Sequence, residues 1–232
     1  MRSLPSGLRR FLFILGIVIL VLLALPYLLT PLYRFGHPVS TTMMWRHLTG
    51  SRVQRIYVPI GCMAPSLPLT VIIAEDGTFC RNRGVDFSAI REALHQADED
   101  FQEARGGSTI TQQTVKNLFL WQGRSFIRKA LEVPLALWMN LVLPKRRVLE
   151  IYLNIAEWGP NGEFGAEAGA RYAFGKSARE LTARQAAELA AILPNPVHRS
   201  ARVPSQQLRK LAGVYERRAA DHPNFDACVR SR

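Results

Sequence analysis

The chain contains little cysteine, and its histidines fall in no ligand motif. Its three cysteines lack the CxxC or related spacing of a metal site, and none of its five histidines lies in such a motif. A metal held by cysteine or histidine is therefore not expected. Cys62 and Cys80 are the candidates for a pair in an oxidising compartment, although the odd cysteine count argues against a disulfide framework.

Alternation of apolar and polar residues with period two is also missing over any length that a sheet needs, and no segment is repeated. The periodicity is helical instead, so the expected fold class is mainly α. Ser108 should cap one helix, and Pro134 should kink or split another. Helices are expected after Asp86, after Ser108 as far as Phe119, over 124–143, over 145–154, from a Thr182–Gln185 capping box to just before Pro194, and over 206–220.

Acidic residues are scarce relative to basic ones. The chain has 18 Asp and Glu against 30 Lys and Arg, a net charge of +12. Such an excess calls for an anionic partner, and three classes come into question: nucleic acid, anionic lipid headgroups and a phosphate-bearing substrate.

Charge is absent altogether from residues 11–29. As a helix this run would be about 28 Å long, close to the roughly 30 Å hydrocarbon core of a bilayer. Arg2, Arg9 and Arg10 precede it and no acidic residue does, which puts the N-terminus in the cytoplasm and the rest of the chain outside. A cleaved signal peptide is the alternative. The run is longer than a usual signal core and no clean cleavage site follows, which favours a retained anchor.

An external, membrane-attached domain makes nucleic acid an unexpected partner. The basic excess is better matched to phosphate on a lipid, and part of it is expected to line the bilayer surface.

Residues 106–117 form the most informative segment. Gly106 and Gly107 allow close approach of the backbone to a ligand, and Ser108 opens a helix whose N-terminus favours an anion. Gln112 and Lys116 share one helix face, presenting an amide beside a cation. Taken alone, the segment is better explained by a glycine loop, a helix cap and a solvated polar face.

Further motifs surround this segment in a fixed order. They are Glu75-Asp76-Gly77-Thr78-Phe79, 84–86, 106–117, 128–132, 150–154 with Gly159, and 189–196. This series, in this order, resembles the peptidoglycan glycosyltransferases of glycosyltransferase family 51. The resemblance covers roughly residues 45–200, and the 106–117 string is its most specific part. With no room for a transpeptidase domain, the chain is similar to the monofunctional branch of that family.

The resemblance implies a lysozyme-like, two-lobed helical glycosyltransferase domain behind a single N-terminal transmembrane helix. It implies transfer of a diphospho-undecaprenol-linked glycan chain to the 4-hydroxyl of lipid II, at the periplasmic face of a bacterial inner membrane. The expected organisation is a cytoplasmic stub (1–10), a transmembrane anchor (11–30), a membrane-proximal linker and domain edge (31–68), the glycosyltransferase family 51 domain (69–200) and a basic C-terminal tail (201–232). The expected partners are lipid II, the nascent glycan strand, the membrane and other cell-wall synthesis and division proteins.

The resemblance also assigns roles. Glu75 corresponds to the family's general base, and Asp76 is expected to orient its loop. Glu132 is expected as a second essential carboxylate, on the diphosphate side or on a loosely held Mg²⁺ or Mn²⁺. Arg128 and Glu132 can equally form an ordinary i, i+4 ion pair, and both interpretations can hold. The substrate-binding set is Lys116, Arg124, Arg128, Lys129, Gln112, Gln113, Ser108, Thr109 and Asp76.

Three points stay open. Asn82 stands where the family usually has histidine, which is harmless if that residue only braces the loop and damaging if it activates the site. Glu150 and Asn154 share a helix face, and they either support the site or contact the sugar directly. Residues 119–121 belong either to a helix core or to a surface that dips into the membrane. The competing functions are a catalytically weak membrane partner that binds lipid II or recruits wall synthases, and a lytic muramidase.

Overall fold

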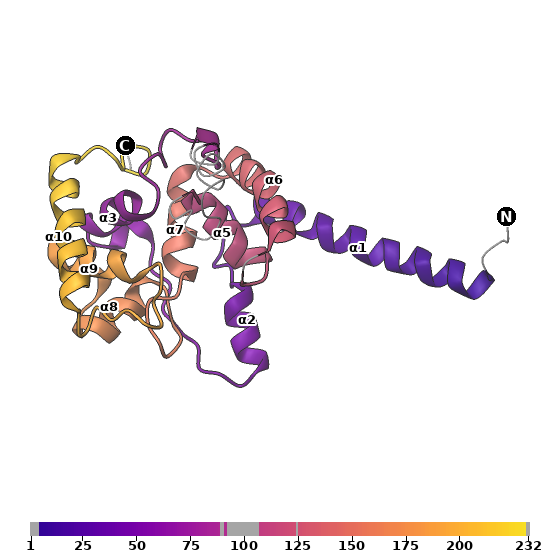
Figure 1. Cartoon of the computed structure of the whole chain (residues 1–232), viewed down its shortest axis with the longest axis horizontal. Coiled ribbons are helices and arrows are strands. Elements are labelled where there is room, and N and C mark those ends of the chain that lie inside the picture. The colour runs from indigo at the N-terminus through magenta and orange to yellow at the C-terminus, as the bar shows by residue number, and fades with distance from the viewer. Residues whose placement is uncertain (1–4, 89–90, 92–106, 124, 231–232) are drawn as a thin grey trace.

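A computed structural model describes residues 5–88, 91, 107–123 and 125–230 of the chain. Its α-helices, shown in Figure 1, are α1 (Ser6–Leu32), α2 (Thr41–Leu48), α3 (Ser66–Glu75), α5 (Ile110–Phe119), α6 (Phe126–Val142), α7 (Lys145–Ile155), α8 (Ala166–Phe174), α9 (Ala183–Ile192) and α10 (Gln206–Asp221). Two short 3-10 helices cover Ile60–Cys62 and Ala178–Glu180. The strands β1 (Gln54–Arg55) and β2 (Glu163–Phe164) pair in parallel, with Gln54 opposite Glu163. The mainly α prediction is confirmed.

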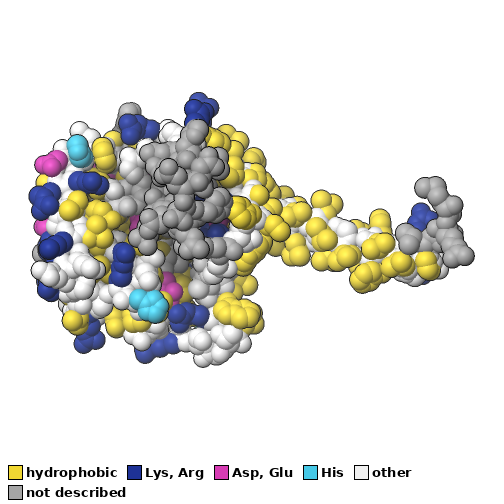
Figure 2. All heavy atoms as spheres, in the orientation of Figure 1, with side chains coloured by type: hydrophobic (Ala, Val, Ile, Leu, Met, Phe, Trp, Pro, Cys, Tyr) yellow, Lys and Arg dark blue, Asp and Glu magenta, His cyan; other side chains and the backbone are white. Residues whose placement is uncertain are grey.

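The apolar run forms α1, a helix of 27 residues that is long and apolar enough to cross a membrane. It projects from the globular part, and hydrophobic side chains cover its exposed length (Figures 1 and 2). Its C-terminal end is attached to the globular part, because Trp138 of α6 donates from Nε1 to the carbonyl of Tyr27 at 3.0 Å. The expected anchor therefore has a fixed point of contact with the domain.

The remaining helices pack in two groups. Near α1, α5 packs against α6 and α7; at the other end, α3 packs against α9 and α10 (Figure 1). Helix α7 lies within the core, since Val148, Leu149, Ile151 and Leu153 are fully buried. The segment 31–68, expected as a linker and domain edge, contains α2, whose Met43 is buried in the same core.

Several predicted helix features are confirmed, one is wrong, and of the kink or split expected at Pro134 the split is ruled out. The Thr182–Gln185 capping box starts α9 as expected. Ser108, however, does not cap α5; Thr109 does, and its partner is Gln112. Pro134 does not split its helix, because α6 continues through it with Leu135, Ala136 and Met139 buried on the face toward the core. Beyond Ser88, the helix expected after Asp86 falls largely outside the described residues.

The disulfide joins Cys80 to Cys228, so the pairing of Cys62 with Cys80 is wrong. Cys62 is exposed and free. Cys80 lies in the loop after α3 and Cys228 lies beyond α10, 148 residues away. Packing of α10 against α3 brings these two distant segments together, which the spacing along the chain does not reveal.

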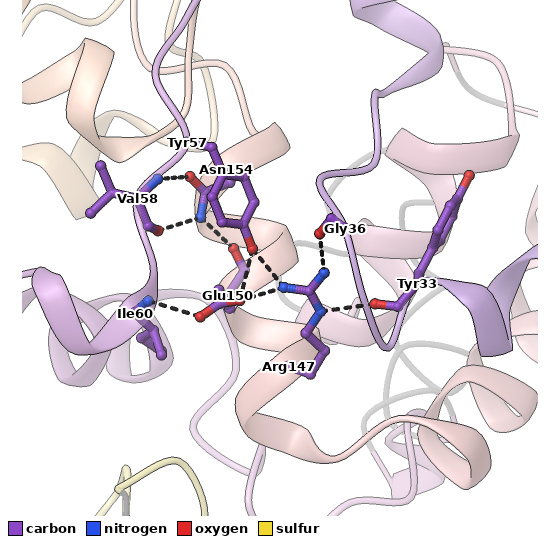
Figure 3. A network of polar contacts seen from close by, with 8 residues as sticks. All are labelled: Tyr33, Gly36, Tyr57, Val58, Ile60, Arg147, Glu150 and Asn154. Atoms are coloured by element: carbon purple, nitrogen blue, oxygen red, sulfur yellow. Dashed lines mark hydrogen bonds and ion pairs between the residues drawn. The ribbon is translucent and has the colours of Figure 1, made fainter.

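A polar network joins the start of α7 to the chain that leaves α1 (Figure 3). Arg147 donates to the carbonyl of Tyr33 at 2.8 Å, to the carbonyl of Gly36, and to the Tyr57 hydroxyl at 2.6 Å. Arg147 also pairs with Glu150, which accepts from the backbone N–H of Ile60 at 2.9 Å. The network therefore holds the segment that follows α1 against a core helix.

Asn154 completes this network by accepting from the N–H of Val58 and donating to its carbonyl, both at 2.9 Å (Figure 3). Since Glu150 and Asn154 are both engaged with the 57–60 backbone, the structure favours their role as supports over direct sugar contact.

Candidate active site

Glu75 is the last residue of α3, a helix anchored by the fully buried Leu67, Val71 and Ile72. Its carboxylate accepts a hydrogen bond of 2.8 Å from the side-chain N–H of Gln113 on α5. Gln113 in turn accepts from the hydroxyl of Tyr152 on α7 at 3.1 Å. Three helices thus hold the carboxylate in place.

Burial raises the pKa of Glu75 above its usual value, and the neighbouring charge of Asp76 adds to the rise. The hydrogen bond from Gln113 and the charges of Lys116 and Arg199 act in the opposite direction. A half-buried carboxylate of raised basicity, still held as an acceptor, is suited to removing a proton from a hydroxyl.

Asp76 connects the loop after α3 to the start of α5. Its carboxylate accepts from the backbone N–H of Ile110 at 3.0 Å, the Thr78 hydroxyl at 3.1 Å and the Asn82 amide at 3.0 and 3.1 Å. Burial raises its pKa, and these hydrogen bonds oppose the rise. Both oxygens of Asp76 are therefore occupied by hydrogen bonds that connect the loop to the start of α5.

Asn82 uses both ends of its amide. Its nitrogen donates to Asp76, while its oxygen accepts from the N–H of Gly84 at 3.0 Å and from Lys145 Nζ at 2.9 Å. Lys145 also lies 4.6 Å from the centre of the Phe79 ring, and burial lowers its pKa to about 8. Asn82 is thus a brace that does not titrate, which agrees with the harmless alternative for this position.

Thr109 and Gln112 form the capping box at the start of α5. Thr109 accepts from the N–H of Gln112 at 3.1 Å and donates to the carbonyl of Gly84 at 2.6 Å. Gln112 is completely buried, and its side-chain oxygen accepts from the N–H of Thr109 at 3.1 Å. The structure therefore gives both residues a role in building the helix start, whereas Gln113 reaches the Glu75 carboxylate.

Three cations lie close together between α5 and α6: Lys116, Arg128 and Lys129. Arg128 and Lys129 both pair with Glu132, which is only 2% exposed; the Lys129 contact measures 3.1 Å. Lys129 also donates to the Ser108 hydroxyl at 2.9 Å. Burial and the charges of Arg128 and Lys116 lower the pKa of Lys129 to about 8. The predicted i, i+4 ion pair of Arg128 and Glu132 is present. With three cations and one carboxylate, the group keeps a net positive charge.

Two cavities flank the Glu75–Gln113 hydrogen bond, each of about 240 Å³. One is lined by Glu75, Asp76, Thr78, Ser108 and Thr109 among others. The other contains Gln113, Lys116, Asn117 and Tyr152, with Leu193 and Pro194 from the end of α9. Glu75 therefore borders one of these spaces and Lys116 the other. Arg124, predicted to bind substrate, lies outside the described residues.

Known proteins match this chain over most of its length. The transglycosylase family model matches residues 41–219. This chain belongs to the transglycosylase family. A biosynthetic peptidoglycan transglycosylase of Nitrobacter hamburgensis is 60% identical over 211 residues, covering 91% of this chain and 93% of the relative. That of Rhizobium meliloti is 47% identical over 230 residues, covering 98% and 95%.

Family membership agrees with the lysozyme-like fold expected from the motifs. In this transglycosylase the match begins at residue 41, where α2 begins, and ends within α10. Residues from the membrane-proximal segment and from the basic tail are thus included in the family's common fold.

A divalent cation held by protein groups does not fit the described part of this transglycosylase. Both oxygens of Glu132 are engaged by Arg128 and Lys129. No group of three or more His, Cys, Asp or Glu comes together among the residues described. Mg²⁺ prefers several oxygen ligands, and Glu132 offers no oxygen that is free of a cation here.

Sequence reasoning missed three neighbours of the site in this transglycosylase: Tyr152, Lys145 and Arg199. Tyr152 and Lys145 lie on α7, within or just before the 150–154 motif. Arg199 follows α9 and acts on Glu75 by its charge. The motif order marks α7 as part of the site, but it does not show which side chain turns toward Gln113.

Proposed function

We propose that the chain is a peptidoglycan glycosyltransferase that polymerises lipid II into glycan strands for cell-wall synthesis. The observation that carries the proposal is a half-buried Glu75, held by Gln113, beside a group of cations on α5 and α6. The relatives named biosynthetic peptidoglycan transglycosylase support the same reaction.

The geometry suggests a division of labour in the transfer. Glu75 takes the proton of the acceptor's 4-hydroxyl as that oxygen forms a bond to the anomeric carbon of the donor. The bond from that carbon to the diphosphate breaks, and its electron pair leaves with the diphospho-lipid. Lys116, Arg128 and Lys129 stabilise the charge that develops on this leaving group. Glu132 keeps two of the three cations in position.

The same cations separate this proposal from a lytic enzyme. A muramidase also uses a carboxylate, but its leaving group is a sugar hydroxyl without phosphate. Burial lowers the pKa of all three cations, and neighbouring cations lower those of Lys116 and Lys129 further. Such a group is costly unless an anion binds beside it. A diphosphate supplies that anion.

We also propose that the chain is a single-pass protein of the inner membrane, with a cytoplasmic N-terminus and a periplasmic domain. Helix α1 has the length and composition for the span. The Cys80–Cys228 disulfide supports an oxidising compartment for the domain, since such bonds are rare in the cytosol.

An apolar groove of about 540 Å³ supports the membrane-dipping alternative for residues 119–121. It is lined by Thr41, Thr42, Trp45 and residues 119–122. Phe119 stacks on Tyr33, directly after α1, with ring centres 5.7 Å apart. This places the groove beside the exit of the anchor, where the lipid tail of the substrate would remain in the bilayer. Contacts with other cell-wall synthesis and division proteins stay a prediction.

The test is to give the detergent-solubilised full chain labelled lipid II, with Mg²⁺ and separately with EDTA. Polymer of increasing length supports the proposal, and polymer in EDTA would show that no cation is needed. Shortening of added glycan strands would instead indicate a muramidase. Binding of lipid II without any polymer would indicate a catalytically silent membrane partner.

A further inference from the structure

Tyr152 lies directly behind the Glu75–Gln113 pair and is 1% exposed. Its hydroxyl donates to the side-chain oxygen of Gln113 at 3.1 Å, and the side-chain nitrogen of Gln113 donates to Glu75 at 2.8 Å. The three side chains form a line of hydrogen bonds that leads from the core helix α7, through α5, to the end of α3.

The direction of the Gln113 amide matters to Glu75. Its N–H group stabilises an ionised carboxylate, whereas its oxygen could meet only a protonated one. Among the residues that the structure describes, the Tyr152 hydroxyl has no hydrogen-bond partner other than Gln113. If the amide turned round, this buried O–H would lose its acceptor, and an unsatisfied buried donor is costly.

We propose that Tyr152 is a positioning residue for the glycosyl transfer, fixing the direction of the Gln113 amide so that Glu75 is held as an ionised acceptor. The inference rests on the proposed function, because it concerns how the base of that reaction is kept ready. Burial and the charge of Glu75 raise the pKa of Tyr152 well above its usual value, so the hydroxyl keeps the proton that it donates.

Other groups act on Glu75 from each element packed around it. They are Asp76 after α3, Lys116 on α5, Arg199 after α9 and Tyr215 on α10. Removal of the Tyr152 hydroxyl alters none of them directly. A change in the titration of Glu75 in a Tyr152→Phe variant would therefore report on the path through Gln113.

The experiment compares the pH dependence of lipid II polymerisation in the native chain and in Tyr152→Phe, which removes only the hydroxyl. We expect kcat to fall about tenfold and the acidic limb of kcat/KM to move up by about half a pH unit, with KM little changed. Tyr57→Phe is the matched control, since its hydroxyl contacts Glu150 and Arg147 instead of Gln113. Its acidic limb should stay in place.

A double-mutant cycle with Gln113→Leu tests the route. Adding Tyr152→Phe to Gln113→Leu should shift the acidic limb no further, because the link is already broken. The inference would be wrong if Tyr152→Phe shifted the acidic limb of Gln113→Leu as much as it shifts that of the native chain. It would also be wrong if the acidic limb of Tyr152→Phe coincided with the native one.

Titration of ¹³C-labelled Glu75 by NMR separates failure of the inference from failure of the proposed function. The Glu75 pKa should be higher in Tyr152→Phe than in the native chain, whether or not polymer forms. An unchanged Glu75 pKa with normal polymerisation overturns the role of Tyr152 alone. If neither the native chain nor any folded variant forms polymer, the proposed function is wrong. The Glu75 pKa measured by NMR still tests the role of Tyr152 in that case.

Discussion

At the scale of single residues, the site consists of charged groups whose surroundings move them from their ordinary pKa values. Burial raises the pKa of Glu75 and lowers that of Lys116, Lys129 and Lys145. All four groups are thereby biased toward their neutral forms. Hydrogen bonds or nearby opposite charges partly compensate at Glu75, Lys116 and Lys145, which leaves the site sensitive to pH on both sides of neutrality.

Lys129→Arg tests the basic side. The pKa of Lys129 is lowered to about 8, so the free enzyme loses this cation above that pH and kcat/KM should fall there. Arginine stays charged, so the basic limb of Lys129→Arg should move upward in a polymerisation pH profile.

Lys145→Arg is the matched control for this prediction, because the pKa of Lys145 is also lowered to about 8 but its contact is Asn82. A basic limb that moves only in Lys145→Arg would contradict the assignment to Lys129. Raising the pH acts in opposite directions on substrate binding and on the stability of the fold. A lysine with a lowered folded pKa destabilises the fold below about pH 8, and this cost disappears as the pH rises past its unfolded value.

The sequence could predict which residues carry charge to the site, because the motif order marks Glu75, Asp76, Lys116 and Glu132. It could not predict that Asn82 joins Asp76 to Lys145, or that Tyr152 reaches Gln113. Those contacts join residues from separate helices, and only packing decides which side chains meet.

At the scale of helices, local rules predicted much of the fold. The Thr182–Gln185 box and the limits of α7 and α10 follow from capping and periodicity. The cap of α5 was misplaced by one residue, although the rule itself favours Thr109. A capping box needs Glu or Gln three positions on, and Gln112 satisfies that for Thr109 but not for Ser108.

Arg147→Lys tests the connection between α7 and the segment that follows α1. Lysine cannot reproduce the guanidinium contacts with Tyr33, Gly36, Tyr57 and Glu150. We expect a loss of about 2 kcal/mol in the free energy of unfolding, measured by denaturant titration in detergent.

Arg184→Lys is the control for this variant. Arg184 pairs with Glu188 and Glu216, and its side chain is 37% exposed against 13% for Arg147, so its loss should stay below about 0.5 kcal/mol. Equal effects of the two substitutions would contradict a special role for the Arg147 network.

At the scale of the whole molecule, the disulfide connects the loop beside Glu75 to the C-terminal segment. Replacing Cys80 and Cys228 by serine should reduce the free energy of unfolding by about 2–4 kcal/mol. A reductant should lower the melting temperature of the native chain and leave that of the double variant unchanged. Cys62→Ser, which removes the free thiol, should behave like the native chain. Insensitivity of the native chain to reductant would contradict this account.

The sequence predicted the long apolar N-terminal helix and the mainly α class, because both depend on composition and periodicity along the chain. The partner of Cys80 could not be predicted, because it lies 148 residues away and is brought close only when α10 packs against α3. Local sequence patterns therefore do not predict which distant segments of the chain lie side by side in the folded molecule.

The most direct test of the central claim compares lipid II polymerisation by the native chain, Glu75→Gln and Glu188→Gln. Glu188 pairs with Arg184 on α9, away from the Gln113 contact, and serves as the matched control. The account predicts polymer from the native chain and from Glu188→Gln, and a rate reduced by at least about 10²-fold in a Glu75→Gln variant that still binds lipid II. Polymerisation by Glu75→Gln at the native rate would contradict it.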